Sequence, residues 1–258
     1  GGKVFTGRPV KKIIVEGGQA TGLCLRDGET RSYDHIISTM PLTQLIATMD
    51  DVPPSVRATA AGLKFRNTII VYLQVAGKNL FPDNWLYIHS SELKTGRITN
   101  FRNWVPQLCT DDNTILALEF WSNADEPLWN KTDAEMIDLA KDEIRQTGLI
   151  SDRDILQGAV YRVPKCYPVY QKGYRDKLAM VQPWLDSIKN LYAIGRYGAF
   201  KYNNQDHSIL MGIMASENIA SRKNHQLWDV NTDYESYQES TSITKTGLVK
   251  EGRLELAS

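Results

Sequence analysis

The stretch from Asn190 to Ile219 is the feature that most constrains the fold. Leu191 to Ile194 form a short apolar run that stops at Gly195, which is typical of a buried strand. A polar and aromatic turn follows, and from Ser208 onward apolar residues recur at helical spacing. A strand that feeds a polar loop and opens a helix is a natural anion or cofactor site, because the first N–H groups of the helix face the loop. An ordinary strand-to-helix corner with a satisfied polar turn fits the same pattern.

Length and composition place the chain among ordinary globular proteins. At 258 residues it is longer than an average domain, so one large or two modest domains both fit. Its 42% hydrophobic and 23% charged content is usual for a soluble fold. The 30 basic residues balance the 30 acidic ones. A large nucleic-acid surface needs a clustered positive field, so we expect no nucleic-acid partner.

The apolar runs, cysteines and histidines of the sequence indicate whether to expect a membrane span, disulfide bonds or a metal site. No run approaches the length of a membrane span and no signal-peptide pattern opens the chain, so we expect no membrane span. Widely spaced cysteines in odd number predict reduced, mostly buried thiols in a cytoplasmic protein. The histidines are not paired with cysteines or acids at metal-ligand spacing, so we expect no metal site. These residues are Cys24, Cys109, Cys166, His35, His89, His207 and His225.

The first 45 residues predict short strands joined by tight turns. A strand-like run from Val10 to Val15 is followed by Gly17-Gly18, a second strand, and Asp27-Gly28, which is a strong hairpin signal. His35 to Thr39 predicts a buried strand. This antiparallel meander would have little to pack against by itself. We therefore expect the opening to be a cut into a larger protein.

Residues 46–189 predict a sheet with flanking helices, and hence an α+β fold. A helix over Pro41 to Met49 leads into this segment, and a second helix, capped by Ser55, follows. Several strands then come in a row, and consecutive strands imply antiparallel neighbours in the sheet. Thr132 and Glu135 fit a capping box at the start of the clearest helix. The predicted strands are Thr68–Val75, Trp85–His89, Arg97–Phe101, Thr114–Phe120 and Ile155–Val163.

The C-terminal third predicts one more helix and a polar tail. A modest helix is expected over Asp176 to Trp184, and Pro183 argues that it ends early. Tyr234 to Thr246 has little periodicity, which predicts an extended or disordered tail that packs on the body through Trp228.

Two segments resemble flavin-dependent enzymes, although the chain contains no G-x-G-x-x-G, P-loop, G-x-S-x-G or H-E-x-x-H motif. The opening, GGKVFTGRPVKKIIVEGG, is similar to the segment that finishes the FAD domain of flavin-containing amine oxidases. From Gly195 the chain has GRYGAFKYNNQDHS. This resembles the flavin-contacting motif of UDP-galactopyranose mutases, especially the eukaryotic type, in which R-G-R-F-G-S-W-(K/R)-Y precedes N-Q-D-H-S. The resemblance covers roughly residues 1–222.

The resemblance implies an FAD-dependent enzyme in four segments. Residues 1–45 would be a remnant of the FAD-binding domain, 46–189 the substrate domain with a mixed, largely antiparallel sheet, and 190–222 a return to the FAD-binding domain. Residues 223–258 would be a polar tail. FAD would be the cofactor of the complete protein, whose nucleotide-binding half is expected outside these 258 residues.

The resemblance also implies roles for particular residues. The strand at Val10 would meet the adenine end of FAD through its backbone, and Gly195 and Arg196 would lie against the flavin. Tyr167, Arg196 and Tyr202 would bind a substrate diphosphate. The remaining residues would line the active site or bring the helix start to the flavin: Asn204, Gln205, Asp206, His207 and Ser208.

Physical chemistry supports these roles but leaves alternatives. A helix N-terminus stabilises the negative charge of a reduced flavin, and Arg196 offers a planar fork for phosphate oxygens. Tyr167 and Tyr202 are neutral donors. Equally, Arg196 could form a structural ion pair and the tyrosines could be half-buried core residues. His207 is expected as a structural hydrogen-bonder, no residue is assigned as catalytic, and three aromatic residues are expected in the core: Trp184, Tyr197 and Phe200.

One departure limits the functional prediction. The mutases carry a second arginine on the strand that matches Thr68 to Gly77, where this chain has Val75-Ala76-Gly77. Losing half of a diphosphate clamp would weaken a sugar-nucleotide ligand. The first hypothesis is a mutase-like enzyme that acts on a sugar nucleotide through a reduced flavin. The alternatives are an FAD-dependent oxidoreductase of the amine oxidase or protoporphyrinogen oxidase type, and an isolated chain that is inactive without its nucleotide-binding half.

Overall fold

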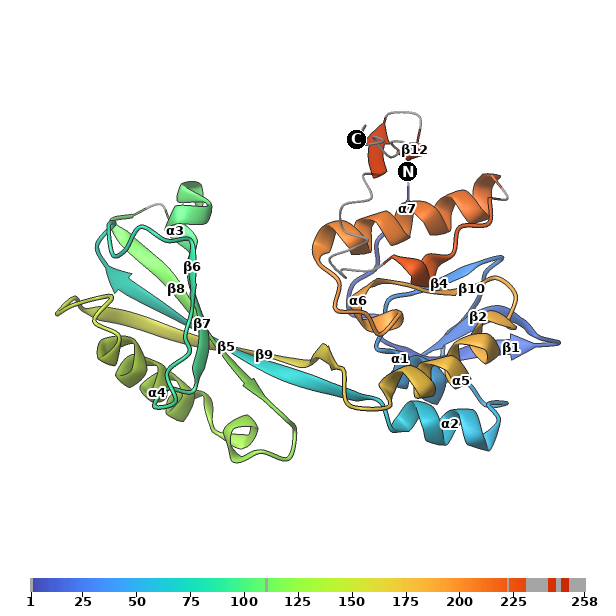
Figure 1. The fold of residues 1–258 in the computed structure, drawn as a ribbon, viewed down its shortest axis with the longest axis horizontal. Coiled ribbons are helices and arrows are strands. Elements are labelled where there is room, and N and C mark those ends of the chain that lie inside the picture. Colours follow the sequence, from blue (N-terminus) through green and yellow to red (C-terminus); the bar gives the residue numbers. More distant parts are fainter. Residues whose placement is uncertain (1, 110, 222, 231–240, 245–246, 251–258) are drawn as a thin grey trace, which may run out of the picture. The chain divides into compact units, whose positions relative to one another are not determined.

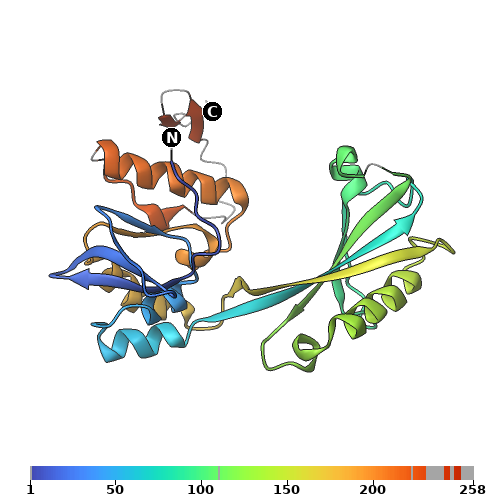
Figure 2. The ribbon, with the colours of Figure 1, turned by 180° about the vertical axis from the view of Figure 1, so that it is seen from behind.

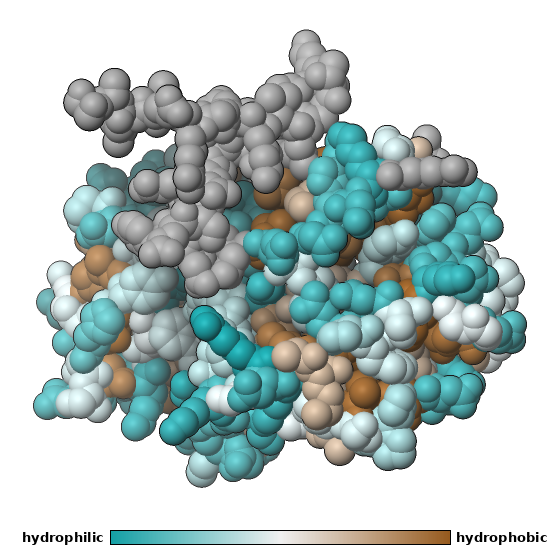
Figure 3. All heavy atoms as spheres, turned by 45° about the vertical axis from the view of Figure 1, so that its right-hand side comes forward, coloured by the Kyte–Doolittle hydropathy of each residue, from teal (hydrophilic) through white to brown (hydrophobic). Residues whose placement is uncertain are grey.

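The computed structural model describes residues 2–109, 111–221, 223–230, 241–244 and 247–250, which form two compact units (Figure 1). Unit 1 combines Gly1–Lys64 with Pro168–Ser258, and unit 2 is Phe65–Tyr167. The four segments predicted from the sequence, with limits at 45, 189 and 222, are a different division and stay a prediction. Within the described ranges, every helix is too short or too polar to cross a membrane. Hydrophilic residues surround scattered hydrophobic ones on the side seen in Figure 3.

Unit 1 begins with an antiparallel sheet in the order β1-β2-β3. Gly17 and Gly18 join the first two strands, and their φ values of 57° and 74° lie in the region that glycine adopts without strain. Gly28, at φ 90°, makes the second turn. The predicted hairpins are therefore confirmed. The strands are β1 (Val10–Glu16), β2 (Gln19–Leu25) and β3 (Thr30–Ser32).

A parallel pair of short strands joins two distant parts of the chain. β4 (Ile36–Ser38) pairs with β10 (Leu191–Ala193). Just before β10, the side-chain amide of Asn190 donates to the carbonyl oxygens of Ala20 and Asp34, and its Oδ1 accepts from the Ala20 N–H at 3.1 Å. Because one side chain bonds to the backbone of two earlier segments, it fixes where β10 enters unit 1.

Two predicted helix ends in unit 1 are wrong. Ser55 is not the N-cap of its helix, because the helix already begins at Pro54, a residue preorganised for the first helical position. The third helix continues past Pro183, since Val181 and Leu185 are buried and their packing outweighs the missing backbone hydrogen bond. The helices are α1 (Leu42–Ala47), α2 (Pro54–Ala61) and α5 (Tyr174–Asp186).

The chain after β10 contains α6 (Gly195–Gly198), α7 (Gln205–Ser221) and η3 (Leu227–Asp229). The indole of Trp228 is buried and donates to the Ala193 carbonyl at 3.0 Å, which confirms that the tail packs on the body there. β11 (Thr241–Thr244) and β12 (Gly247–Lys250) pair as an antiparallel hairpin. The rest of the predicted extended tail, residues 234–240 and 245–246, lies outside the described residues.

Unit 2 is a five-stranded sheet in the order β6-β7-β8-β5-β9, with α4 along one face (Figures 1 and 2). β5 pairs antiparallel with β8, β8 with β7, and β7 with β6. The predicted α+β fold with a largely antiparallel sheet is confirmed. The strands are β5 (Lys64–Ala76), β6 (Trp85–Tyr87), β7 (Thr95–Asn100), β8 (Asn113–Ser122) and β9 (Ile155–Val169).

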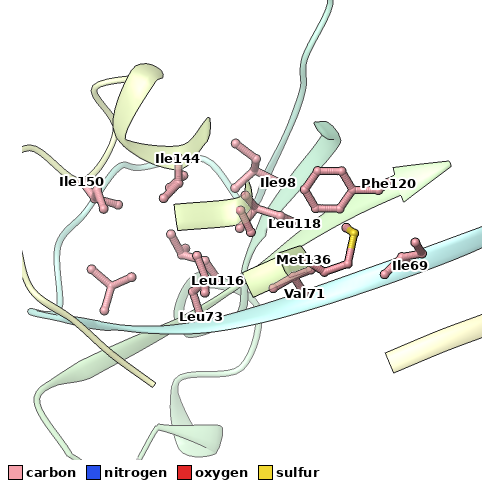
Figure 4. Packing of buried hydrophobic residues seen from close by; sticks show 12 residues of the cluster. Ile69, Val71, Leu73, Ile98, Leu116, Leu118, Phe120, Met136, Ile144 and Ile150 are labelled. Atoms are coloured by element: carbon pink, nitrogen blue, oxygen red, sulfur yellow. The ribbon is translucent and has the colours of Figure 1, made fainter. Parts of the chain in front are cut away.

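The core of unit 2 lies between the sheet and α4 (Asp133–Gln146). Alternate side chains of the central strands pack against one apolar stripe of the helix (Figure 4). α4 opens with the predicted capping box, in which the Glu135 N–H donates to Thr132 Oγ1 and the Thr132 N–H to Glu135 Oε2. Shorter helices are α3 (Phe101–Trp104), η1 (Pro106–Leu108) and η2 (Pro127–Asn130).

Candidate functional site

The candidate site in unit 1 begins where the two parallel strands end. The Ile194 N–H donates to the Ser38 carbonyl at 3.0 Å, and the chain then turns at Gly195, whose φ is 77°. A Cβ on Gly198 would lie 2.8 Å from the Ser38 oxygen, so only glycine allows α6 to pack on the end of β4. The carboxyl ends of parallel strands are the place where open α/β sheets bind ligands.

The loop after α6 brings Arg196 and Tyr202 together. Arg196 Nε donates to the Asn203 carbonyl at 2.6 Å, and the guanidinium carbon lies 5.5 Å from the centre of the Tyr202 ring. The Lys201 N–H donates back to the Arg196 carbonyl at 3.0 Å. These contacts hold a half-buried cation against an exposed phenol, an arrangement suited to a phosphate or another anion.

Buried polar atoms lie behind this loop. Ser38 Oγ and Asn203 Oδ1 are buried and find no hydrogen-bond partner among the described residues. The other end of the Asn203 amide lies 3.2 Å from Met211 Sδ, which also accepts from the Gly195 N–H at 3.4 Å. An unpaired buried polar atom costs about 1–3 kcal/mol and calls for an explanation, such as a bound group with complementary polar atoms.

The start of α7 completes the site. The Asn204 carbonyl accepts from the N–H and the hydroxyl of Ser208, both at 3.2 Å, which closes the first turn. Asp206 Oδ1 lies 2.9 Å from Nδ1 of the buried His207, so His207 has the structural contact expected of it. Gln205 begins the helix and is exposed. The first N–H groups of such a helix lack intrahelical acceptors and present positive charge.

An aromatic cluster, which the sequence did not predict as part of the site, supports the loop. Tyr170 and Tyr174 stack with ring centres 4.3 Å apart, and both lie beside the buried Phe200. The Tyr170 hydroxyl accepts from the Tyr202 N–H at 2.7 Å. Phe200 is a core residue, as predicted, and its φ of 51° marks the sharp turn of the loop.

The predicted residues do not all meet at this loop. Gly195, Arg196, Tyr202 and the run Asn204 to Ser208 share one loop and helix start. Val10 begins β1, on the separate antiparallel sheet of unit 1. Tyr167 lies near the end of β9, is half-buried, and belongs to unit 2.

Four residues of the site were missed: Ser38, Tyr170, Asn203 and Met211. Asn203 directly precedes a predicted residue, and Tyr170 follows Tyr167 by three positions, so their neighbourhood was visible in the sequence. Their contacts were not, because spacing along the chain does not show that Tyr170 reaches Tyr202.

Comparison with protein families identifies the family of this chain. Residues 1–220 match the family of flavin containing amine oxidoreductases, and the chain belongs to this family. The predicted membership of the flavin amine oxidase and UDP-galactopyranose mutase superfamily is confirmed.

Solved structures show the same fold at low sequence identity. Reduced UDP-galactopyranose mutase is 24% identical, with a TM-score of 0.76, over 87% of this chain and 49% of that one. A putative protoporphyrinogen oxidase from Exiguobacterium sp. 255-15 is 17% identical, with a TM-score of 0.55, over 74% and 42%. The CLA-producing fatty acid isomerase from P. acnes is 16% identical, with a TM-score of 0.54, over 83% and 47%. The chain thus spans less than half the length of each.

The residues at the unit 1 loop fit one wall of a flavin site. The isoalloxazine ring of a flavin combines a flat apolar surface with an edge of carbonyl oxygens and an N–H group. Gly195 leaves open space, since a Cβ there would meet only Ser208 Oγ, at 4.0 Å. The unpaired Ser38 hydroxyl, the Asn203 amide oxygen and the α7 N-terminus supply polar partners of both kinds.

Proposed function

We propose that this chain forms one wall of the flavin site, and part of the substrate site, of an FAD-dependent enzyme that acts on a sugar nucleotide, as UDP-galactopyranose mutase does. The observation that carries the proposal is the pairing of Arg196 with Tyr202 next to the N-terminus of α7. A cation, a phenol and a helix start within one loop provide three kinds of anion contact.

Each residue has a role within this proposal. Gly195 admits the flavin, and the N–H groups at the start of α7 stabilise negative charge on its pyrimidine edge. Arg196 and Tyr202 bind the substrate diphosphate, and Tyr170 positions Tyr202 through its N–H. When bound, FAD would supply the reactive centre of the enzyme, either as an electron carrier or as a nucleophile.

The other assigned residues remain proposals of the same kind. Asn204 and Gln205 line the active site, while Asp206, His207 and Ser208 hold the first turn of α7. The backbone at Val10 meets the adenine end of FAD, and Tyr167 is a second diphosphate contact. The three cysteines are free and half-buried, which favours the cytoplasm as the place of action.

The proposal is tested with protein that carries bound FAD. Dithionite-reduced protein is incubated with UDP-galactopyranose, and the ring-contracted product is measured by chromatography. We expect conversion only under reducing conditions. Arg196→Ala should raise the substrate KM at least tenfold, about 1.4 kcal/mol, while the flavin absorbance stays. Arg145→Ala, which changes an exposed residue of α4, is the matched control. Unchanged affinity in Arg196→Ala would contradict the diphosphate role.

An FAD-dependent oxidoreductase of the amine oxidase or protoporphyrinogen oxidase type is the second candidate, because of one observation in unit 2. β5 has no arginine at its end: Val75 is fully buried in the core and Gly77 has no side chain. Arg153 lies against this end of the strand, with Nη1 donating to the Ala76 carbonyl at 3.4 Å, and Arg97 is paired with Glu119. Oxygen-dependent flavin turnover on an amine or a porphyrinogen, without ring contraction, would support this candidate. A chain unable to hold FAD alone is the third.

A further inference from the structure

One edge of the unit 2 sheet is long and open. Within the part of the chain that the structure describes, β9 has β5 as its sole neighbour in the sheet. Along residues 155–163 its other edge therefore presents backbone N–H and C=O groups outward. β9 has 15 residues, whereas β6, the strand at the opposite edge, has 3. A long edge can pair with another strand, because it offers a row of hydrogen bonds that a short edge cannot.

Three contacts show which way the side chains of β9 point. A Cβ on Gly158 would lie 2.8 Å from the Ile137 side chain of α4. Val160 packs on the core beneath that helix, and Arg162 forms an ion pair with Asp133 at the start of α4. Even-numbered residues of this stretch thus face α4, and odd-numbered ones point to the other face of the sheet.

This stretch of edge lacks the features that keep strands of different molecules apart. Natural edge strands are protected by charges, by prolines or by being short. Residues 155–161 contain no charged residue and no proline, and the charge of the next residue, Arg162, is paired with Asp133. Two large side chains lie half or more in water, Leu156 at 50% and Tyr161 at 62% exposed. The edge is therefore open to pairing until Pro164.

The sequence of the edge matches a second copy of itself. A two-fold axis perpendicular to the sheet sets two identical strands antiparallel and keeps both α4 helices on one side. With the axis at Ala159, Gln157 of one copy lies opposite Tyr161 of the other. Leu156 then lies opposite Arg162, and each pair occurs twice. An amide meets a phenol, an apolar side chain meets the aliphatic part of an arginine, and like charges do not meet.

The helix beside the edge fits the same symmetry. Lys141 follows Ile137 by one turn, on the flank of α4 toward β9, and its Nζ lies 3.7 Å from Asp138 Oδ1. Two such helices on one side of a joined sheet turn these flanks toward each other in opposite directions. Each flank carries an acid and a base, so a second copy brings complementary charges, which a partner of a single charge sign would not.

We propose that the outer edge of β9 is an interface at which two copies of this chain pair antiparallel, so that two five-stranded sheets become one continuous sheet. Backbone hydrogen bonds along residues 155–163 supply the affinity, as in the addition of a strand to an open edge. Because the contact is one strand wide, we expect a weak dimer with a Kd of about 10 μM. The surface lies within unit 2 and does not depend on the flavin wall of unit 1.

Two measurements on the full chain test the interface. Sedimentation velocity from about 1 to 100 μM spans the expected Kd, and the mass should rise from 29.2 kDa toward twice that value. Hydrogen–deuterium exchange at both ends of this range locates the contact. Residues 155–163 should exchange more slowly at the higher concentration, while β6 should not change. A monomer at every concentration, or a dimer without added protection in β9, would overturn the proposal.

Charge changes at two exposed positions test the antiparallel geometry. Gln157→Lys combined with Tyr161→Lys places lysine opposite lysine, so dimerisation should weaken at least tenfold. Gln157→Glu combined with Tyr161→Lys places opposite charges there and should keep the dimer. Parallel pairing of the same strands would instead set like charges opposite one another in both variants.

A matched control separates this effect from a general effect of charge. Gln146→Lys changes an exposed residue of α4 that helical spacing puts on the side away from Ile137, and it should leave the dimer unchanged. Thermal unfolding checks that each variant folds. An unchanged dimer in the variant with two lysines, or dissociation of the variant with glutamate and lysine, would overturn the proposal.

Discussion

Units 1 and 2 position their polar groups in different ways. In unit 1 the candidate site is built mainly from main chain: the turn at Gly195, the close approach of Gly198 to the Ser38 carbonyl, and the first N–H groups of α7. In unit 2 the polar side chains are arranged by strand register, which places Arg97 opposite Glu119. A main-chain site depends on glycines and helix starts, which are local in sequence. An arrangement set by strand register depends on partners from different strands.

We expect the largest loss of stability when unit 2 loses a side chain that joins its sheet to α4. Glu143 of α4 is buried and accepts from the N–H groups of Lys94 and Thr95, both at 2.8 Å, and from the Thr95 hydroxyl at 2.6 Å. Glu143→Ala leaves these donors unpaired, so we expect the free energy of unfolding to fall by about 3–5 kcal/mol. Urea denaturation measures it. Asp142→Ala, at the exposed neighbouring position, should change it by less than about 0.5 kcal/mol. A small loss for Glu143→Ala would show that side chains matter less in unit 2 than we argue.

In unit 1 the corresponding weak point is a glycine. Gly198→Ala would place a Cβ 2.8 Å from the Ser38 carbonyl, and we expect a loss of about 1–3 kcal/mol in unfolding free energy. Gly212→Ala is the matched control, because a Cβ at that position of α7 meets nothing within 4 Å. There alanine should stabilise the protein by about 0.5–1 kcal/mol through its higher helix propensity. Thermal unfolding of the two variants measures whether each change lowers or raises the stability. Equal effects of the two changes would contradict the claim that unit 1 depends on the close approach of Gly198 to the Ser38 carbonyl.

A smaller effect is expected at the cap of α4. Thr132→Ala removes the acceptor of the Glu135 N–H and should cost about 1 kcal/mol. Thr132→Ser keeps the hydroxyl and should retain most of the stability. Denaturation of both variants under the same conditions decides the point, and an equal loss in the serine variant would mean that the threonine methyl group matters instead.

The smallest effect concerns pH. The backbone hydrogen bond from Thr132, followed by the one from its side chain, lowers the pKa of Glu135 below its ordinary value of 4.5. A group whose pKa is lower in the folded state stabilises the protein above its unfolded pKa, and this stability is lost as the pH falls through the folded pKa. Glu135→Gln should therefore flatten the fall of stability below pH 4.5, measured as unfolding free energy against pH. If the unfolding free energy of this variant falls below pH 4.5 as steeply as before, the Glu135 carboxylate does not stabilise the cap.

Much of the fold could be predicted because its signals are local. The capping box of Thr132 and Glu135, the turn at Gly17-Gly18 and the alternation along β5 each involve residues a few positions apart. Pro183 shows the limit of such signals, because the buried Leu185 keeps the helix going where the local preference predicts an end.

The site was predictable to the extent that it forms one segment. Gly195 to Ser208 could be recognised as a loop and helix start from their order alone. The bond from Tyr202 to Tyr170, the approach of Gly198 to Ser38 and the Arg97–Glu119 pair could not. Each depends on contacts between residues more than 20 positions apart, which pairing and packing create and which no spacing reveals.

The pairing of β4 with β10 has a consequence for the order of folding. Unit 2 is one continuous segment, and its first and last strands, β5 and β9, are neighbours in the sheet, so it can form as soon as its own residues are available. Unit 1 has to wait until Leu191–Ala193 meets Ile36–Ser38, across a loop whose closure costs entropy. During synthesis on the ribosome the inserted unit would be finished first. Once unit 2 has folded, the chain between the two halves of unit 1 behaves as a shorter loop. Closing that loop to pair β4 with β10 then costs less entropy.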